Sequence, residues 1–218
     1  MKHNDLEITR DLEEVIHPET TALLVYDMQV GIFEQAPTLR PVIESVASVI
    51  EACRAAGVRI FFCRHTSLPP NLMGRSQLRT AMAWQRVDSP EKVRSLFLRD
   101  SPNTALIPEA TALPTEAVFD KLGMSAFAGT PLDMALRDCG ITSVAIVGVV
   151  LEIGIGPTVS HAEDLGYVPV VIEDACGSVD PDARERVLAG MAGTLMSLTT
   201  DVATFRRLIE KTRVGPAS

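Results

Sequence analysis

Continuously apolar runs alternate along this chain with segments whose apolar residues recur at helical spacing. Five runs predict strands and a weaker sixth follows them: residues 21–27, 58–64, 117–121, 143–148, 168–174 and 195–200. Because these runs are apolar at consecutive positions, rather than at every second position, both faces of each strand should be covered, as in parallel sheets.

Helical patterns follow most of these runs. Residues 41–57 carry apolar side chains at helical spacing and end in a glycine, which suits a helix terminus. Thr130 and Pro131 predict the start of another helix, as its N-cap and first helical residue. Further helices are expected at 157–165, from Pro181 onward, and near the C-terminal end. This alternation, joined by right-handed crossovers, predicts an α/β fold: a three-layer doubly wound domain with a mostly parallel sheet.

One long connection, at about residues 65–112, departs from the alternation. Helices are expected within it around 75–84 and at 91–98. A connection of this length between strands is usually functional, as a lid or as an arm that reaches a second subunit. No internal repeat or linker divides the chain, so residues 1–218 are expected to form a single domain.

Composition narrows the class of protein. At 218 residues with 46% hydrophobic and 22% charged residues, the chain has the balance of a globular domain that needs no disulfide or metal for its core. No apolar run reaches the roughly 18 residues of a membrane span, and the polar start does not resemble a secretory signal. A net charge of −8 argues against a nucleic-acid partner. Four widely spaced cysteines are expected to be reduced thiols in a cytoplasmic protein.

Ionisable residues stand where several predicted strands end. Asp27 closes the first strand, Lys121 closes the third, and Glu152 follows the fourth. Ligands of open parallel sheets bind outside the carboxyl ends of the strands, so these three side chains are expected at one edge as catalytic residues. Each also has a structural alternative, as a helix cap or turn former for Asp27, a solvated lysine for Lys121, and a loop-holding carboxylate for Glu152.

Four stretches together resemble a known family: LLVYDMQVGIF, FDKLGMSAFAGTPLDMALRDCGI, VAIVGV and SHAEDLGYVPVVIEDACGS. In this order, over roughly residues 20–200, they resemble the isochorismatase-like hydrolases, a superfamily that also contains nicotinamidases and N-carbamoyl amidases. The resemblance implies the fold expected above. It also implies a catalytic Asp that matches Asp27 and a catalytic Lys that matches Lys121.

The resemblance breaks at the nucleophile. Most members carry a reactive Cys at the start of the helix after the fourth strand, and the run GVVLEIGIG aligns Gly154 with that position. Of the four cysteines, only Cys63 lies near enough to the sheet edge to be kept as a relocated nucleophile. The family's Gly-bearing isochorismatases imply a different chemistry, with Asp27 as a general acid and no covalent intermediate. Gly154 would then give the substrate room, and backbone amides at the helix start would hold an anionic group.

Glu152 is a second departure, because the family usually has a neutral or basic side chain at this position. Three roles are open: a general base for water, a partner for Lys121, or a selector for a cationic or hydroxyl-rich substrate. The most specific hypothesis is a site with two carboxylates, in which Asp27 is protonated, Glu152 is ionised, and Lys121 lies nearer Glu152 than Asp27. The alternative is a purely structural pair of Glu152 and Lys121.

Further residues near the sheet edge are expected to bind substrate: Gly154, Gln29, Ile153, Ile155, Arg64 and Trp84. Arg64, Arg75, Arg79 and Arg86 are candidates to grip a substrate carboxylate, and for each of them a solvated arginine is the alternative. The metal-binding histidines of nicotinamidases have no counterpart except the isolated His65, so no metal is expected. No glycine-rich phosphate motif follows the first strand, so no dinucleotide cofactor is expected.

The sequence thus predicts an isochorismatase-like hydrolase that cleaves a small polar metabolite by non-covalent acid–base chemistry. A non-catalytic binding or scaffold protein and an amidase with a relocated nucleophile are the alternatives. The expected partners are a small-molecule substrate and further copies of the chain. A homodimer or homotetramer is expected, because a monomer would expose apolar residues of the long connection to water. These residues are Leu78, Met82 and Trp84.

Overall fold

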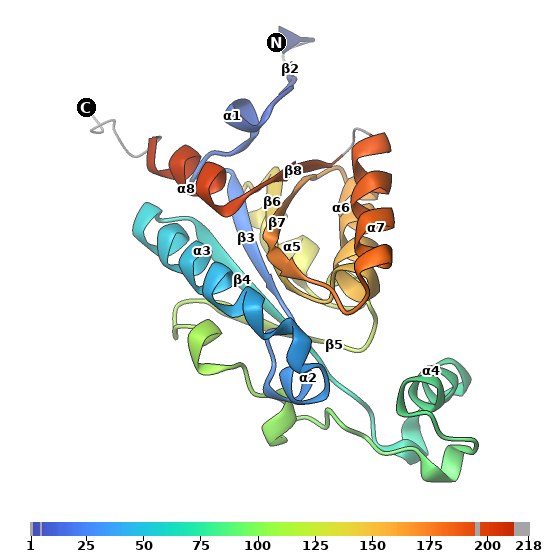
Figure 1. Ribbon diagram of the computed structural model, residues 1–218. Helices are drawn as coiled ribbons and strands as arrows, with labels where there is room; N and C mark the ends of the chain where they lie inside the picture. The colour runs from blue at the N-terminus through green and yellow to red at the C-terminus, as the bar shows by residue number, and fades with distance from the viewer. Residues whose placement is uncertain (1, 5, 195–196, 212–218) are drawn as a thin grey trace.

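The computed structural model describes residues 2–4, 6–194 and 197–211 and contains a six-stranded, wholly parallel sheet (Figure 1). The strand order is β5-β4-β3-β6-β7-β8. The strands are β3 (Thr21–Tyr26), β4 (Arg59–His65), β5 (Ala117–Lys121), β6 (Ser143–Val149), β7 (Val168–Gly177) and β8 (Leu198–Thr200). The apolar runs therefore predicted this sheet correctly, except that residues 195–196 of the sixth run lie outside the described residues.

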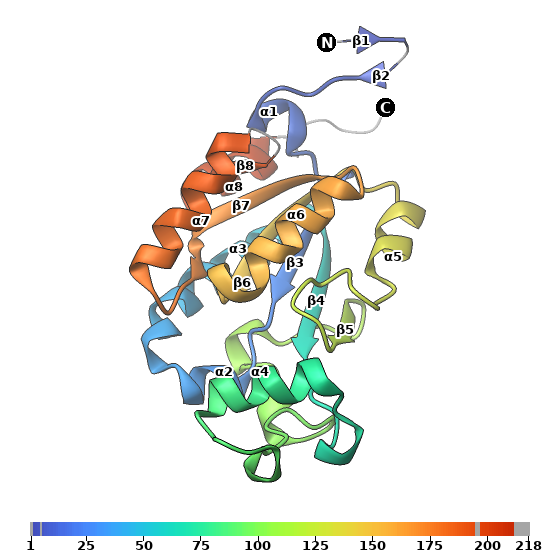
Figure 2. The ribbon, with the colours of Figure 1, turned by 90° about the vertical axis from the view of Figure 1, so that its right-hand side faces the viewer.

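Helices cover both faces of the sheet, which gives the three layers that the sequence predicted (Figures 1 and 2). One face packs against α3 (Ile43–Ala56) and α8 (Val202–Lys211), which bury apolar side chains such as Val49 and Phe205 against it. The other face packs against α5 (Leu132–Asp138), α6 (Gly156–Asp164) and α7 (Pro181–Thr194). Since both faces are buried, the strands are apolar at consecutive positions.

Shorter elements complete the chain. They are β1 (Lys2–His3), β2 (Leu6–Glu7), α1 (Leu12–Val15), α2 (Val30–Gln35), α4 (Arg75–Gln85), the 3₁₀ turns η1 (Pro37–Val42), η2 (Pro70–Leu72), η3 (Pro90–Lys92), η4 (Pro102–Thr104) and η5 (Pro108–Ala110), and the π-helical turn η6 (Leu151–Ile155). The helix expected around 75–84 is α4. The helix expected at 91–98 is wrong, because only the turn η3 forms there. Val93 and Phe97 in this segment are instead buried as anchors.

The strand order reverses between β3 and β6, and this switch point brings distant parts of the chain together. Tyr26 at the end of β3 pairs with Gly148 of β6. Gly148 has a φ of 122°, and a Cβ on it would lie 2.9 Å from the backbone nitrogen of Tyr26, so only glycine allows the two strands to approach here. In open parallel sheets such a crevice is the usual ligand site.

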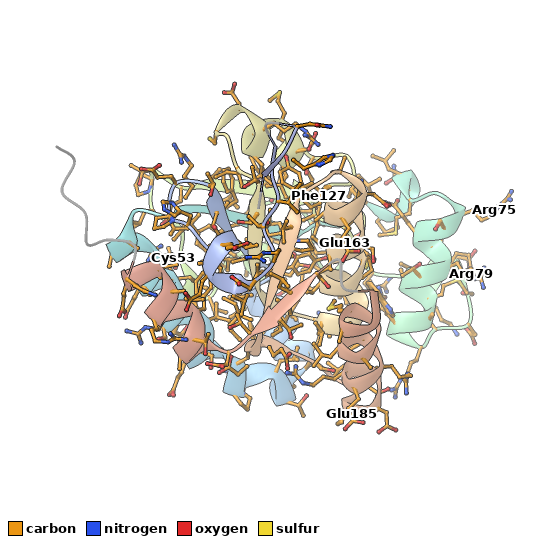
Figure 3. All side chains as sticks on the ribbon, turned by 90° about the horizontal axis from the view of Figure 1, so that it is seen from above. Cys53, Arg75, Arg79, Phe127, Glu163 and Glu185 are labelled. Atoms are coloured by element: carbon orange, nitrogen blue, oxygen red, sulfur yellow. The ribbon has the colours of Figure 1, made fainter. Side chains whose placement is uncertain are left out.

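None of the helices in residues 2–4, 6–194 and 197–211 has the length and apolar character that crossing a bilayer requires. The connection from β4 to β5 carries α4, which lies beyond the carboxyl end of β4 (Figure 2). Arg75 and Arg79 on this helix point away from the body of the protein (Figure 3). This places the connection beside the edge of the sheet where the switch point opens.

Candidate active site

Asp27 and Lys121 form a buried ion pair at the carboxyl edge of the sheet. Asp27 follows β3 directly, with a φ of 49° in the left-handed region, and Lys121 ends β5. The Nζ atom of Lys121 lies 2.8 Å from Oδ2 of Asp27, and the two side chains are almost fully buried. Burial raises the pKa of Asp27, and the charge and hydrogen bond of Lys121 oppose that increase. The carboxyl group is therefore poised nearer to holding a proton than an exposed aspartate.

Tyr26 and Cys63 lie beside this pair on one face of the sheet. They are register partners in β3 and β4, and the Sγ atom of Cys63 lies 3.8 Å from Oδ1 of Asp27. Lys121 places Nζ 4.3 Å from the centroid of the Tyr26 ring, a cation–π arrangement. Burial raises the pKa of Tyr26 and of Cys63 well above their ordinary values, so both groups stay protonated at neutral pH.

The phenol of Tyr26 fills the space next to Gly154. A Cβ atom on Gly154 would lie 2.6 Å from Cε1 of Tyr26 and closer still to its hydroxyl oxygen. That hydroxyl donates a hydrogen bond to the carbonyl of Met124. The expectation that Gly154 leaves room for a substrate is therefore wrong at this point, because an aromatic ring from β3 already occupies the room.

The backbone amides around Gly154 are also already engaged. The amides of Ile153, Gly154 and Ile155 all point to the carbonyl of Val150, at 3.3, 3.0 and 3.2 Å. These bonds arise because the chain turns through the π-helical segment η6 before α6 begins. The expectation that these amides hold an anionic group is therefore wrong, since their hydrogen atoms are directed into the turn.

Glu152 points away from the ion pair. Its Oε1 atom accepts hydrogen bonds from the amides of Val179 and Asp180, at 2.9 and 3.1 Å, in the segment after β7. Lys121 instead donates to Asp27. The arrangement with Lys121 nearer Glu152 than Asp27 is therefore wrong, and so is the structural pair of Glu152 with Lys121. The carboxylate holds η6 against the loop that precedes α7.

A cavity of about 240 Å³ opens onto Asp27 and Lys121. Gly154, Ile153 and Trp84 of α4 are among its lining residues. Aromatic side chains and Met124 contribute to the wall as well, among them Tyr26, His65 and Phe97. The structure therefore brings Asp27, Lys121, Gly154, Ile153 and Trp84 together around one cavity.

Three other predicted residues do not line this cavity in the described structure. Gln29 is buried and exchanges hydrogen bonds with the backbone of His65, at 2.7 and 3.0 Å, which fixes the loop after β3 to β4. Ile155 lies in the core. Arg64 is paired with Asp120 at 2.7 Å and is therefore not available for a substrate carboxylate. Arg75, Arg79 and Arg86 are likewise absent from the described wall.

His65 was not predicted as a site residue, although it lines the cavity. Its ring contacts Trp84 and Phe97, with centroids 6.3 and 5.4 Å apart. Burial, with a further contribution from the charge of Lys121, lowers the pKa of His65 to about 4, so the imidazole is neutral near pH 7. Tyr26 was missed as well, and its signal was present: a polar aromatic residue directly before Asp27, at the end of a mostly aliphatic strand.

Within the part of the chain that the structure describes, no three His, Cys, Asp or Glu side chains converge as metal ligands. The four cysteines are free thiols. Asp27 and Lys121 are the acidic and basic side chains among the described residues that line the cavity.

The family model for the isochorismatase domain matches residues 21–203. The chain belongs to the isochorismatase family of hydrolases. This isochorismatase-family chain is 26% identical to ureidoacrylate amidohydrolase RutB of Methylobacterium radiotolerans, over 93% of this chain and 84% of that protein.

Solved structures share the isochorismatase fold. A cysteine hydrolase from Pseudomonas syringae pv. phaseolicola superposes with a TM-score of 0.79 and 22% identity, over 91% of this chain and 96% of the other. N-carbamoylsarcosine amidase from Thermoplasma acidophilum superposes with a TM-score of 0.66 and 22% identity, over 84% and 96% of the two chains. The wholly parallel sheet with helices on both faces is therefore the isochorismatase-like fold.

Proposed function

We propose that this isochorismatase-family protein hydrolyses a small metabolite by acid–base chemistry and without a cysteine nucleophile. One observation carries the proposal. The Tyr26 phenol occupies the space that any side chain at position 154 would need, and the family resemblance puts the nucleophile at that position. This packing supports a site that works without a thiol at position 154.

Asp27 is the proton donor in this mechanism. Burial raises its pKa, which favours the protonated acid that a leaving oxygen requires. Asp27 gives its proton to the leaving oxygen as the scissile bond breaks, and Lys121, 2.8 Å away, stabilises the carboxylate that remains. Water adds to the other fragment as hydroxide, and its second proton returns to Asp27. No covalent intermediate is needed, and the protein ends in its starting state.

Cys63 supports a second candidate function, an amidase with a relocated nucleophile. Its Sγ atom lies within 3.8 Å of the Asp27 carboxylate, which is the geometry for removing a thiol proton. Against this candidate, Cys63 is buried, burial raises the pKa of its thiol, and it is not among the described residues that line the cavity. Acid–base hydrolysis therefore has the better support.

Hydrolysis across a panel of small ethers, esters and amides separates the candidates. With acid–base chemistry, Asp27→Asn lowers kcat by about a hundredfold to ten-thousandfold, because the proton donor is lost. Cys63→Ser and treatment with iodoacetamide leave kcat within a few-fold of the untreated protein. A loss with Cys63→Ser as large as that with Asp27→Asn would instead identify Cys63 as the nucleophile. No Asp27-dependent turnover on any member would favour a non-catalytic binding protein.

A further inference from the structure

We propose that the ligand of this protein extends from the catalytic cavity into a second cavity beneath α4, and that the part held there is uncharged and partly apolar. The inference rests on the proposed function for the position of the scissile group beside Asp27. It adds a second subsite and a chemical class for the group that fills it.

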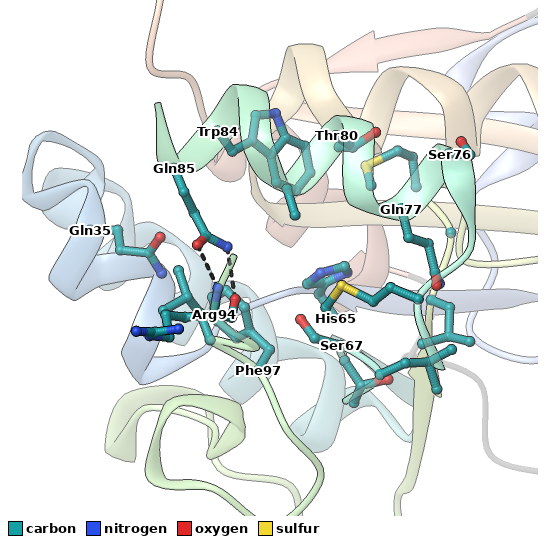
Figure 4. A pocket seen from close by; sticks show the side chains of 18 residues that line it. Gln35, His65, Ser67, Ser76, Gln77, Thr80, Trp84, Gln85, Arg94 and Phe97 are labelled. Carbon is teal, nitrogen blue, oxygen red and sulfur yellow. Dashed lines mark hydrogen bonds between the residues drawn. The ribbon is translucent and has the colours of Figure 1, made fainter. Parts of the chain in front are cut away.

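The second cavity has a volume of about 420 Å³ and adjoins the catalytic cavity. The two cavities share five wall residues: Gln35, His65, Trp84, Phe97 and Met124. Trp84 hangs from α4 over His65 in Figure 4. A ligand that reaches Asp27 at one end can therefore place its other end beneath α4, past the ring of His65.

The charges of the two cavities favour an uncharged ligand. In the catalytic cavity Lys121 is already engaged by Asp27 at 2.8 Å, and His65, which lines both cavities, is neutral because its pKa is lowered to about 4. Among the described residues of the second cavity, Arg94 is the one that carries a charge, and it is exposed. A carboxylate held between these walls would lose its hydration without gaining a buried partner, which is costly.

The lining of the second cavity defines the class of group further. Met73, Leu96, Leu122 and Trp84 contribute apolar surface. Ser76, Gln77 and Thr80 bring hydroxyl and amide groups from α4 and its start (Figure 4). Such a wall suits an aryl or branched alkyl substituent that carries one or two neutral polar atoms.

Trp84 makes the proposal directly measurable, because it is the single tryptophan of the chain and lines both cavities. Its fluorescence therefore reports binding whether or not the ligand turns over. We expect N-cyclohexylacetamide to change the emission saturably, and acetamide to have no effect at the same concentrations. The ring-carboxylate analogue of N-cyclohexylacetamide should bind at least about tenfold more weakly.

A matched pair of variants tests the position. Ala81 lines the second cavity, whereas Ala83 on the same helix is exposed and is not among the lining residues. Ala81→Leu should weaken N-cyclohexylacetamide by about tenfold or more, because it fills the cavity, and Ala83→Leu should leave binding unchanged. Equal effects of the two variants would overturn the second subsite.

The charge class has its own test. Tighter binding of the carboxylate analogue, lost in Arg94→Gln, would show an anion site and overturn the proposal of an uncharged group. Binding that appears only when an oligomer is diluted to monomers would show a second copy of the chain as the occupant. The subsite and the catalytic mechanism are tested separately with Asp27→Asn. If this variant binds N-cyclohexylacetamide normally, the subsite stands, whether the variant has lost turnover or the parent protein shows none.

Discussion

The phenol of Tyr26 occupies the space that a side chain at position 154 would need. Glycine at position 154 therefore permits the tyrosine at position 26. We expect Gly154→Ala to lower the free energy of unfolding by about 1–3 kcal/mol, because the added methyl overlaps the phenol. Gly156→Ala is the control, since its Cβ would meet neighbours at an ordinary 3.4 and 3.5 Å. Urea denaturation measures both variants.

The same pair predicts a coupling. Tyr26→Val by itself destabilises the protein, because it removes a buried ring. In that background Gly154→Ala should cost much less than in the parent protein, since the atoms that it would strike are gone. An equal cost in the two backgrounds would show that the conflict at Gly154 lies elsewhere.

His65 predicts a pH dependence of stability. Its pKa is about 4 in the folded protein and 6.5 as an ordinary histidine, so between these values the unfolded chain takes up a proton that the folded protein does not. The free energy of unfolding should therefore fall as the pH falls from about 6.5 to about 4, by up to about 1 kcal/mol per pH unit through this group. Measurement of unfolding at several pH values should show a shallower slope for His65→Gln. His17→Gln, at an exposed position, should keep the slope of the parent protein.

Among the elements, η6 is attached to the loop before α7 through the carboxylate of Glu152. We expect Glu152→Ala to lower the free energy of unfolding by about 1–2 kcal/mol, because the amides of Val179 and Asp180 lose their acceptor. Glu152→Gln keeps an oxygen in place and should recover much of that loss. Neither variant should shift the alkaline limb of a pH–rate profile, and a clear shift with Glu152→Gln would restore a catalytic role for this carboxylate.

At the scale of the whole molecule, several large apolar side chains remain exposed. Trp84 and Leu72 on the β4–β5 connection are 53% and 61% exposed, and Met134 on α5 is 70% exposed. Surfaces of this kind favour association with further copies of the chain, so we expect a symmetric oligomer, a dimer or a tetramer. Light scattering at micromolar concentration tests this, and a mass of 23.5 kDa would contradict it. Substituting Met134 or Trp84 by Glu should show which surface is used.

The apolar runs of the sequence determined the sheet. A strand buried on both faces must be apolar at consecutive positions, and that pattern is local enough to be read without the fold. Strand-end placement then predicted Asp27 and Lys121 at one edge of the sheet, because parallel strands present their carboxyl ends there, but it did not predict that they pair with each other. The prediction of a helix at 91–98 was wrong because its pattern is ambiguous. Val93 and Phe97 are four residues apart, which fits one face of a helix, but the same spacing also fits an irregular segment that buries both side chains.

Only the tertiary structure decided what fills the space between those residues. Glu152 follows β6 closely enough in sequence to lie at the site. The turn of η6 nevertheless directs its side chain to the loop after β7. Gly154 indicates an open position in the sequence, and the ring of Tyr26, from a strand far away along the chain, closes it. These outcomes depend on the direction of side chains across neighbouring strands, and hydrophobic periodicity carries no information about contacts between residues so distant in sequence.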